Sequence, residues 1–459
     1  MKVISGNEFL EILYSIQNNF STEHTSFEIS DYVIESQNNL NIDFDKIDVD
    51  YNKIYKTIIF KNLIFKTVYL NIHNGKNRKP SLFISNCVFE TKLYIHANFD
   101  SITFNNNIFK CEKLNISGCK IERLSFRNQE KSYQEKLQNS EFDVKLFEIN
   151  SSEIYDFTME NISFVKESIV SFDRINFSFL FNIQNIYANQ ITVQNCDFLE
   201  HFEYYGQYNI SKFTNCNFVG PSSFTRSVIG ISLNLEFINC NFSKNINLNN
   251  FIANKFELID TTFKEKISFQ ETNFNIIKID RTIFEKGALF DDIQIKKIDD
   301  CDRRTIRAIK QELQKAENRI DFNRFRAYEL ASHYKELDWK WNTGFIDKSI
   351  LFVTKISTDF GNSWRKALRF TIVGGFSIYV IFYIIENRNF QIGLLNLDNW
   401  ARLFSGFFRF LLVTDFYNPL ETDRIYLTNP FSWLIFIFGK IVIAFGIYEM
   451  IQSFRKFKV

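Results

Sequence analysis

Residues 84–124 read ISNCVFETKLYIHANFDSITFNNNIFKCEKLNISGCKIERL, and an apolar or aromatic residue stands at every fifth position of this stretch. The positions are Ile84, Phe89, Tyr94, Phe99, Phe104, Phe109, Leu114, Cys119 and Leu124. A helix places apolar residues at intervals of three and four, and a half-buried strand at intervals of two. Because an interval of five fits neither pattern, the stretch predicts a repeat in which successive units stack on one another.

The same pattern returns in the second half of the N-terminal region. Its centres are separated by 20, 24, 21 and 21 residues: Phe198, Phe218, Phe242, Phe263 and Phe284. A small residue stands two positions before each of the first three centres: Cys196, Cys216 and Cys240. If one coil takes about twenty residues, equivalent side chains stack one strand spacing apart, roughly 4.8 Å. These residues are therefore predicted to form a core ladder in which each coil covers the apolar face of its neighbour.

These residues resemble the pentapeptide-repeat family, whose unit is a small residue, then Asp or Asn, then a central Leu or Phe. The resemblance covers roughly residues 81–295. It implies a mainly β fold, a right-handed quadrilateral β-helix. Two polar segments, 127–143 and 201–211, interrupt the repeat and are expected to loop out of one coil face.

The regions on either side of the repeat differ from it in pattern. Residues 1–80 are expected to form an N-terminal cap and the first β elements, with a short helix from Glu8 to Asn18. Residues 296–345 predict a helical linker, because apolar residues recur there at helical spacing: Ile306, Ile309, Leu313, Ala316 and Ile320. Asp321 is the expected N-cap of a second linker helix. The favoured interpretation of the linker is a cap on the last coil, and a regulatory binding surface is the alternative.

The sequence favours a non-enzymatic protein without a cofactor. It contains no nucleotide-binding glycine loop, nucleophile elbow or HExxH motif, and its five histidines are scattered. Cys196, Cys216 and Cys240 lack the CxxC spacing of a metal site, so they are expected to form a stacked ladder. The N-terminus lacks an apolar signal region, which predicts reduced thiols in the cytoplasm.

Charge argues against nucleic acid as a partner. The net charge of the whole chain is +1. Some pentapeptide-repeat proteins mimic the charge of DNA, which requires a markedly acidic rod. Residues 81–295 contain 26 acidic and 20 basic residues, a net charge of −6, which is too mild to favour such mimicry.

Residues 346–459 predict an α-helical transmembrane module. Two apolar segments, about 367–386 and 431–451, are long enough to span a bilayer. Between them, residues 400–414 are apolar but carry Arg402 and Arg409 on one helical face, and Asp415 follows. This half-helix is expected to lie in the interface or dip partway. The layout is similar to the two-transmembrane pore module of ion channels, although the glycines of a potassium filter are missing.

The second apolar segment carries the residues singled out as candidate sites. Lys440 stands near its middle, where a charge is costly unless it faces protein or water. One hypothesis makes Lys440 a pore-lining or gating charge, and the other pairs it with Asp415 or Glu386, or lets it reach an interface, in an anchoring role. Small residues recur at intervals of seven and predict close helix packing: Ser432, Gly439, Gly446 and Ser453.

Both ends of the membrane module are basic, which places both on the cytoplasmic side. The expected location is a bacterial cytoplasmic (inner) membrane, with the solenoid and the C-terminus in the cytoplasm. The expected partners are the lipid bilayer, further copies of the chain, and an unknown protein or small-molecule signal on the solenoid or linker. The first functional hypothesis is a sensing or binding rod coupled to an oligomeric, pore-like module, such as a stress or defence effector that permeabilises a membrane. The alternative is a membrane-tethered protein-interaction scaffold without transport activity.

Overall fold

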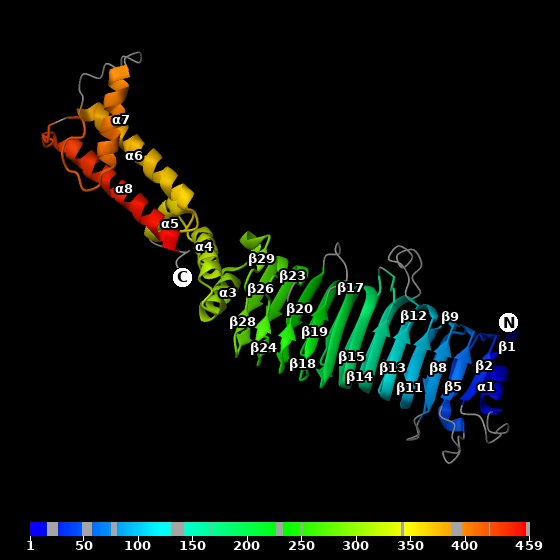
Figure 1. Ribbon diagram of the computed structural model, residues 1–459. Coiled ribbons are helices and arrows are strands. Elements are labelled where there is room, and N and C mark those ends of the chain that lie inside the picture. The colour runs from blue at the N-terminus through cyan, green and yellow to red at the C-terminus, as the bar shows by residue number, and fades with distance from the viewer. Residues whose placement is uncertain are drawn as a thin grey trace. The chain divides into compact units, whose positions relative to one another are not determined.

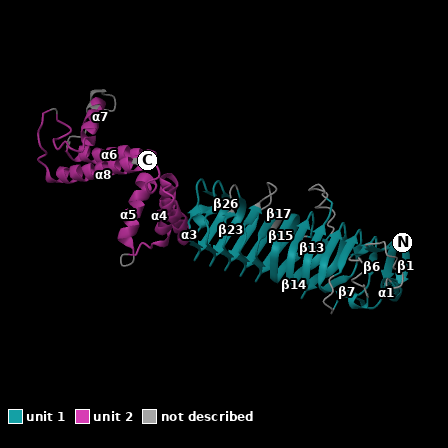
Figure 2. Cartoon of the chain, turned by 60° about the horizontal axis from the view of Figure 1, so that its bottom comes forward, with its two compact units in different colours: residues 1–301 teal, residues 302–459 magenta. Residues whose placement is uncertain are grey.

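A computed structural model describes a β-solenoid followed by helices, with two long apolar helices at the C-terminal end. The described residues are 1–15, 26–47, 57–74, 80–129, 142–165, 167–225, 233–248, 251–340, 344–386, 397–421 and 423–455. The chain divides into two compact units, Met1–Cys301 and Asp302–Val459, which are coloured separately in Figure 2.

The described residues of the first unit form 29 strands that pair in parallel from coil to coil (Figure 1). The first thirteen are β1 (Lys2–Ser5), β2 (Ser26–Ser30), β3 (Tyr32–Glu35), β4 (Leu40–Asp43), β5 (Thr57–Lys61), β6 (Ile64–Lys66), β7 (Tyr69–His73), β8 (Ser81–Ser85), β9 (Val88–Phe89), β10 (Lys92–His96), β11 (Phe99–Asn105), β12 (Ile108–Ser117) and β13 (Lys120–Arg127). The next six are β14 (Phe142–Glu160), β15 (Ile169–Gln194), β16 (Asp197–Phe198), β17 (His201–Thr214), β18 (Asn217–Phe218) and β19 (Ser222–Thr225). The last ten are β20 (Asn234–Ile238), β21 (Asn241–Phe242), β22 (Ile246–Asn247), β23 (Ile252–Ile259), β24 (Thr262–Phe263), β25 (Ile267–Ser268), β26 (Asn273–Asp280), β27 (Ile283–Phe284), β28 (Ala288–Leu289) and β29 (Gln294–Ile295).

The register of these ladders follows the spacing of the repeat. Phe198 pairs with Phe218, Phe218 with Phe242, Phe242 with Phe263, and Phe263 with Phe284. Coil stacking confirms the β-solenoid, which completes about 9 turns in residues 57–295. The stack also continues toward the N-terminus, where β2 pairs with β5 and β5 with β8. The first 80 residues therefore contribute strands to the same ladders.

The N-terminal end of the solenoid core is covered by α1 (Gly6–Tyr14). Its N-cap is Ser5, whose hydroxyl accepts from the Glu8 amide at 3.2 Å while the Glu8 carboxylate accepts from the Ser5 amide at 2.6 Å. This reciprocal pair satisfies two amides that a helix start leaves without a partner. The buried ring of Phe9 packs edge-on against Phe60 and Phe65, both at 5.8 Å between centroids. The predicted helix from Glu8 to Asn18 thus begins earlier, and residues 16–18 lie outside the described part of the chain.

The solenoid differs from the sequence prediction at two places. Residues 201–211 do not loop out: they lie in β17, which pairs with β15 on one side and with β19 and β20 on the other. The prediction was wrong because the polar residues of this segment alternate with buried ones, such as Phe202 and Tyr204, and a strand needs only one apolar face. Tyr94 is half-buried, and its neighbours Leu93 and Ile95 fill the core instead. Most of the other predicted insertion, 130–141, lies outside the described residues.

The second unit contains six described helices. They are α3 (Arg303–Lys315), α4 (Arg319–Glu336), α5 (Phe345–Thr358), α6 (Trp364–Glu386), α7 (Leu397–Leu411) and α8 (Pro430–Arg455). The apolar stripe of the linker is confirmed in α3, where Ile306, Ile309 and Leu313 are buried. It does not extend to Ile320, which is 64 % exposed.

The break between α3 and α4 is capped differently from the prediction. Asn318 is the N-cap, and its side-chain oxygen accepts from the Asp321 amide at 3.1 Å. Asp321, the predicted N-cap, instead lies in the first turn, where a carboxylate favours the positive end of the helix dipole. Asn and Asp are equally good N-cap residues. Asn318 is the N-cap here because α4 begins directly after it, at Arg319. Helix α5 is a further difference, because no helix was predicted between the linker and the first apolar segment.

Candidate functional site

The phenylalanine ladder occupies the core of the solenoid. Adjacent rings from Phe198 to Phe284 stack with centroid distances of 4.8, 4.3, 4.8 and 5.4 Å. These distances match the spacing of paired strands, roughly 4.8 Å, so ring stacking and backbone pairing reinforce each other. None of the five rings is more than 9 % exposed. The ladder therefore holds the rod together and presents nothing to a ligand.

The cysteines form a second internal column. Cys196, Cys216 and Cys240 are buried, and their thiols donate to backbone carbonyls. Burial raises the pKa of Cys196 and Cys240, and it raises the pKa of Cys87 to about 12. Thiols with such pKa values stay protonated at neutral pH, whereas nucleophiles and metal ligands must be thiolates. Among the described residues, no group of three or more His, Cys, Asp or Glu side chains could hold a metal ion.

A third column lies at the corner of the coils and was missed from the sequence. Asn195, Asn215 and Asn239 all have positive φ, between 53° and 54°. Their side chains form a ladder, with Asn239 donating to Asn215 at 2.8 Å and Asn215 donating to Asn195 at 3.0 Å. Asn tolerates left-handed backbone better than most residues, which explains its choice here. The signal was available, because each Asn stands three positions before a ladder phenylalanine.

The same column ends in charged residues in the last coils. Asp260 and Arg281 continue it, with φ of 51° and 48°. Arg281 Nε and Nη2 donate to the two Asp260 carboxylate oxygens at 2.5 and 2.7 Å. This fork-to-fork contact lowers the pKa of Asp260 below its usual value and holds the two coils in register.

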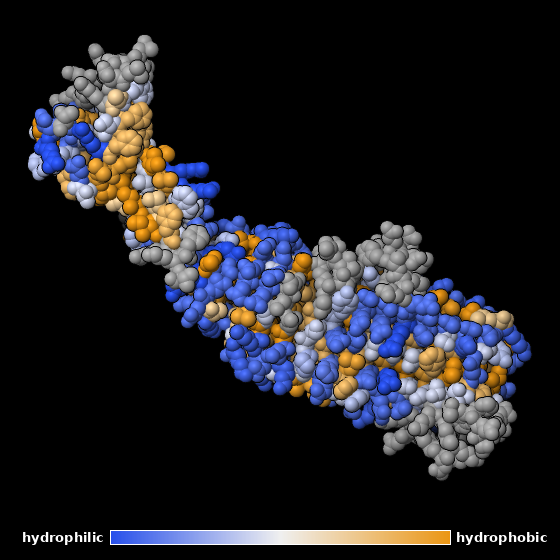
Figure 3. Space-filling model, viewed as in Figure 1, coloured by the Kyte–Doolittle hydropathy of each residue, from blue (hydrophilic) through white to orange (hydrophobic). Residues whose placement is uncertain are grey.

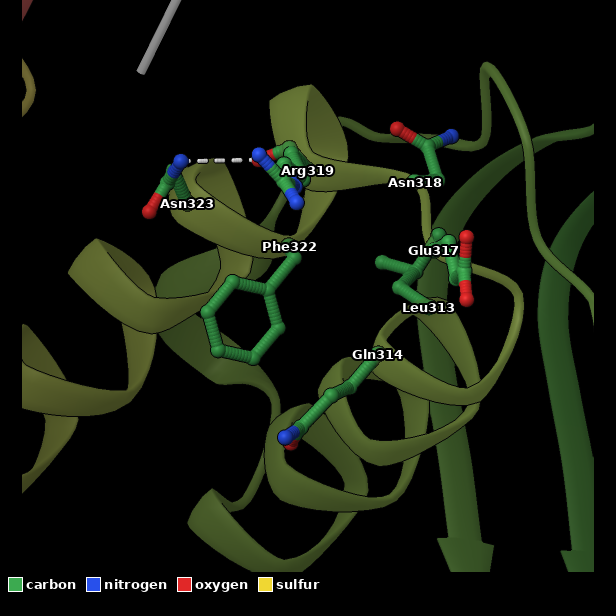
Figure 4. Close-up of a pocket in the computed structure, with 7 residues that line it drawn as sticks. All are labelled: Leu313, Gln314, Glu317, Asn318, Arg319, Phe322 and Asn323. Carbon is green, nitrogen blue, oxygen red and sulfur yellow. Dashed lines mark hydrogen bonds between the residues drawn. The ribbon is translucent and has the colours of Figure 1, made fainter. Parts of the chain in front are cut away.

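A shallow hollow of about 420 Å³ lies at the turn between α3 and α4 (Figure 4). Its lining residues are Leu313, Gln314, Glu317, Asn318, Arg319, Phe322 and Asn323. The Asn323 amide donates to the Arg319 carbonyl at 2.8 Å, so part of the polar lining serves the helix itself. The linker was predicted as a possible regulatory surface, and this hollow is a concave place on the linker that could serve as one.

The two predicted spans form helices that are long and apolar enough to cross a membrane, α6 and α8. Only 22 % and 33 % of the residues in their most apolar segments are buried. A core helix of a soluble protein would bury most of that surface. Figure 3 shows apolar residues on the surface of this unit. The outward faces of α6 and α8 carry large apolar side chains: Ile372, Val373, Ile381, Ile384, Phe431, Leu434, Ile437, Phe438 and Ile441.

Inward faces of α6, α7 and α8, together with Leu427 from the segment before α8, build one apolar core. Its buried members are Tyr379, Phe382, Phe407, Phe410, Leu427, Phe436 and Ile443. The predicted half-helix, 400–414, corresponds to α7, which begins three residues earlier and ends at Leu411. Arg409 donates to the Glu421 carbonyl, which ties the helix to the chain that follows it. Asp415 accepts from the Tyr417 amide at 3.1 Å. The backbone at Arg402 is helical.

Lys440 binds backbone carbonyls at the C-terminal end of α7. Its side chain is 5 % exposed, and its ammonium donates to the Phe410 carbonyl at 2.9 Å and to the Leu412 carbonyl at 2.6 Å. The Phe436 ring lies 4.7 Å from the ammonium. Carbonyls at a helix C-terminus lack partners and carry partial negative charge, so a cation stabilises them. Lys440 is thus bound by two backbone carbonyls at the end of α7 within the same chain.

The small residues of α8 allow the neighbouring helices to approach. A Cβ on Gly446 would lie 2.1 Å from the Thr371 hydroxyl of α6. A Cβ on Gly439 would lie 2.4 Å from the Phe410 ring of α7. Ser432, fully buried, donates to the Glu386 carboxylate, and Ser453 is also fully buried. This stripe therefore packs α8 against helices of the same chain.

The chain matches no protein-family model, no curated protein and no solved structure.

Proposed function

We propose that this protein is a non-enzymatic, membrane-anchored β-solenoid, in which α6 and α8 hold the chain in a bilayer and the solenoid presents a surface to a partner. The observation that supports this proposal is the exposed apolar face of α6 and α8, which no described part of the chain covers. In water this surface would be strongly unfavourable, at about 25 cal/mol for each Å². In lipid it is the ordinary outer surface of a helical hairpin.

The resemblance to pentapeptide-repeat proteins supports the solenoid part of the proposal. The small residue two positions before the central ring is buried at Cys196, Cys216, Cys240 and Thr261. A rod of this kind offers repeated surfaces for a protein or small molecule, and its core groups are all used in packing. We place its partner on the outer faces of the coils or on the α3–α4 hollow.

Orientation follows from positive charge. Arg365, Lys366 and Arg369 stand at the beginning of α6, and Arg455 ends α8. Basic residues near the ends of spans favour the cytoplasmic side. We therefore propose that both ends of this hairpin face the cytoplasm of a bacterial cell, at its inner membrane.

Membrane extraction tests the anchor. The full chain should stay in the membrane pellet after an alkaline carbonate wash, and a chain ending at Cys301 should be released. A full chain that is monomeric and soluble without detergent would overturn the proposal. A full chain that pellets only as aggregate is recognised by flotation, because aggregate does not rise with lipid vesicles.

A pore-like module of several copies is the second candidate. The observation that favours it is α7, a short helix of 15 residues between the two long ones, with outward-facing Phe404 and Phe408. Ion flux through liposomes tests it, with the full chain compared with residues 302–459. Flux would support a pore, and flux that rises without the solenoid would make the solenoid its gate. A Lys440→Leu protein that conducts like the unmodified chain would exclude Lys440 as a pore residue.

A further inference from the structure

Helix α5 (Phe345–Thr358) has an apolar side, and this side is exposed. Its apolar side chains at positions 346, 350 and 353 follow helical spacing and are exposed, with Ile346 at 68 % and Ile350 at 59 %. Ile356 widens the same face. An amphipathic helix normally buries such a face. Here the described residues of the second unit leave it uncovered.

The opposite side of α5 is the one that packs. The Lys348 ammonium lies 5.2 Å from the ring centre of Tyr334 in α4, and the Lys355 ammonium lies 4.8 Å from the same ring. Lys348 also donates to the Leu337 carbonyl. The lysine face is therefore committed to α4, and this contact turns the apolar face outward.

The C-terminal end of α5 is fixed beside the ends of the two apolar helices. Thr358 is fully buried, and its hydroxyl donates to the Glu449 carboxylate of α8 at 3.0 Å. The Lys366 ammonium of α6 lies 3.1 Å from the Asp359 carboxylate. Asp359 and Gly361 have φ of 57° and 85°, which lets the chain turn sharply between α5 and α6. In Figure 2, α5 runs across the direction of α6 and α8.

This corner lies where a span would enter a bilayer. Arg365, Lys366 and Arg369 occupy the first turns of α6 and match the phosphates of a headgroup layer. The next exposed apolar side chains of α6 are Leu368 and Ile372, so its lipid-facing surface begins at this level. Trp339, 51 % exposed, packs edge-on against Phe345 and Phe352 at 5.9 and 6.0 Å. Tryptophan is enriched at the membrane–water interface because its ring is apolar and its N–H is polar.

We propose that α5 is an interfacial helix that lies in the headgroup layer of the leaflet where α6 begins, with Ile346, Ile350 and Val353 in contact with acyl chains. The inference rests on the proposed membrane anchoring and adds a second lipid-binding element to it. Lipid is the occupant that fits best, because the C-terminal end of α5 lies beside the basic first turns of α6, where the exposed apolar surface of α6 begins. An interfacial helix at the base of a span would fix the depth and tilt of the hairpin.

Spin labels at single introduced cysteines test this in the full chain. The seven native cysteines are all buried, which leaves an introduced surface cysteine as the preferred target of a thiol reagent. The three sites are Ile350→Cys on the apolar face of α5, Asp347→Cys on its exposed polar side as the matched control, and Val373→Cys on the outer face of α6. The unmodified chain, treated with the same reagent, is the blank. The protein is reconstituted in liposomes of phosphatidylcholine and phosphatidylglycerol.

Collisions with oxygen, which concentrates in lipid, are compared with collisions with a water-soluble nickel complex. We expect oxygen to dominate at positions 350 and 373 and nickel to dominate at position 347. Dominance of nickel at 350, with oxygen still dominant at 373, would overturn the inference and leave the anchor intact. Dominance of nickel collisions at both 350 and 373 would overturn the proposed membrane anchor itself. Protection of position 350 from both reagents would show that protein covers α5, either a second copy or another chain, and would also overturn the inference.

Discussion

The solenoid buries its ladder phenylalanines, whereas the helical unit exposes several of its own. In the solenoid, Phe218 and Phe242 have no more than 1 % of their surface exposed, whereas Phe431 and Phe438 of α8 are 71 % and 59 % exposed. The difference arises because each solenoid coil supplies a stacking partner for the next, while no described segment covers the outer face of α8. The same residue type thus marks a closed core in one unit and a surface that needs lipid in the other.

All five tryptophans help to separate the two units experimentally. They stand at positions 339, 341, 364, 400 and 433, beyond the solenoid. Tryptophan emission therefore reports the helical unit alone, and the β signal in far-ultraviolet circular dichroism reports the solenoid. Each prediction below uses these two signals on the full chain in detergent.

Interrupting the phenylalanine ladder should have the largest effect. Phe242→Ala removes a fully enclosed ring that stacks on Phe218 at 4.3 Å and on Phe263 at 4.8 Å. We expect the free energy of unfolding of the solenoid to fall by about 3–5 kcal/mol, as for other buried aromatic truncations. Urea titration followed at the β signal measures it, and the tryptophan transition should not move.

Phe179→Ala is the matched control, because that ring is 42 % exposed and stacks on Tyr155 at 5.2 Å. Equal losses for Phe242→Ala and Phe179→Ala would contradict the enclosed ladder. A shift of the tryptophan signal would show that the two units unfold together.

Filling the α6–α8 contact should have the next largest effect, now in the other unit. Gly446→Ala places a methyl group 3.3 Å from the Thr371 backbone and closer still to its side chain. Overpacking of this kind costs about 1–3 kcal/mol. The tryptophan transition should therefore shift to lower denaturant, with the β signal unchanged.

Gly374→Ala is the control for that substitution. Its nearest neighbour would be Val442 at 3.9 Å, an ordinary contact distance. Ala has the higher helix propensity, so this variant should be neutral or slightly stabilised, by at most about 1 kcal/mol. A Gly374→Ala protein as unstable as Gly446→Ala would mean that close packing along the small-residue stripe is not what α8 requires.

A substitution in the asparagine column should destabilise the solenoid less than a substitution in the phenylalanine ladder. Asn239→Ala keeps the positive φ of 53° but loses both the tolerance of Asn for it and the hydrogen bond to Asn215. We expect a loss of about 1–2 kcal/mol in the β transition, the cost of left-handed backbone for an ordinary residue. Asn239→Gly, which accepts this φ freely, should lose less. If the two variants are equally unstable, the hydrogen bond and not the backbone conformation sets the effect.

The smallest effect concerns the exposed pair of Arg281 and Asp260. Arg281→Met removes the hydrogen bonds that lower the pKa of Asp260. A carboxylate with a lowered folded pKa stabilises the fold above its unfolded pKa, and this contribution disappears as pH falls through the folded pKa. The difference between the unmodified chain and Arg281→Met should therefore be present at neutral pH and vanish in acid below the usual Asp range. A difference that persists there would assign it to packing of the Arg281 stem.

Some of these features were decided by the sequence alone. Because the ladder positions are separated by one coil, Phe198 to Phe284 could be assigned to one column without a structure, and so could the cysteines two positions earlier. The apolar segments that became α6 and α8 were likewise evident from length and composition. Local pattern is sufficient here because each coil contacts only its neighbours, and because a span is defined by its own run of apolar residues.

Other features required the tertiary structure. The strand at 201–214 carries many polar residues, and only its register with β15 shows which of them face outward. The partner of Lys440 lies at the end of a different helix, about thirty positions earlier, and the sequence offered carboxylates instead of those carbonyls. The sequence does not show that the apolar face of α5 is exposed, because this depends on the packing of its two lysines against Tyr334 of α4. Repeats and spans are local and could be predicted, whereas contacts between segments distant in sequence depend on how the helices are brought together.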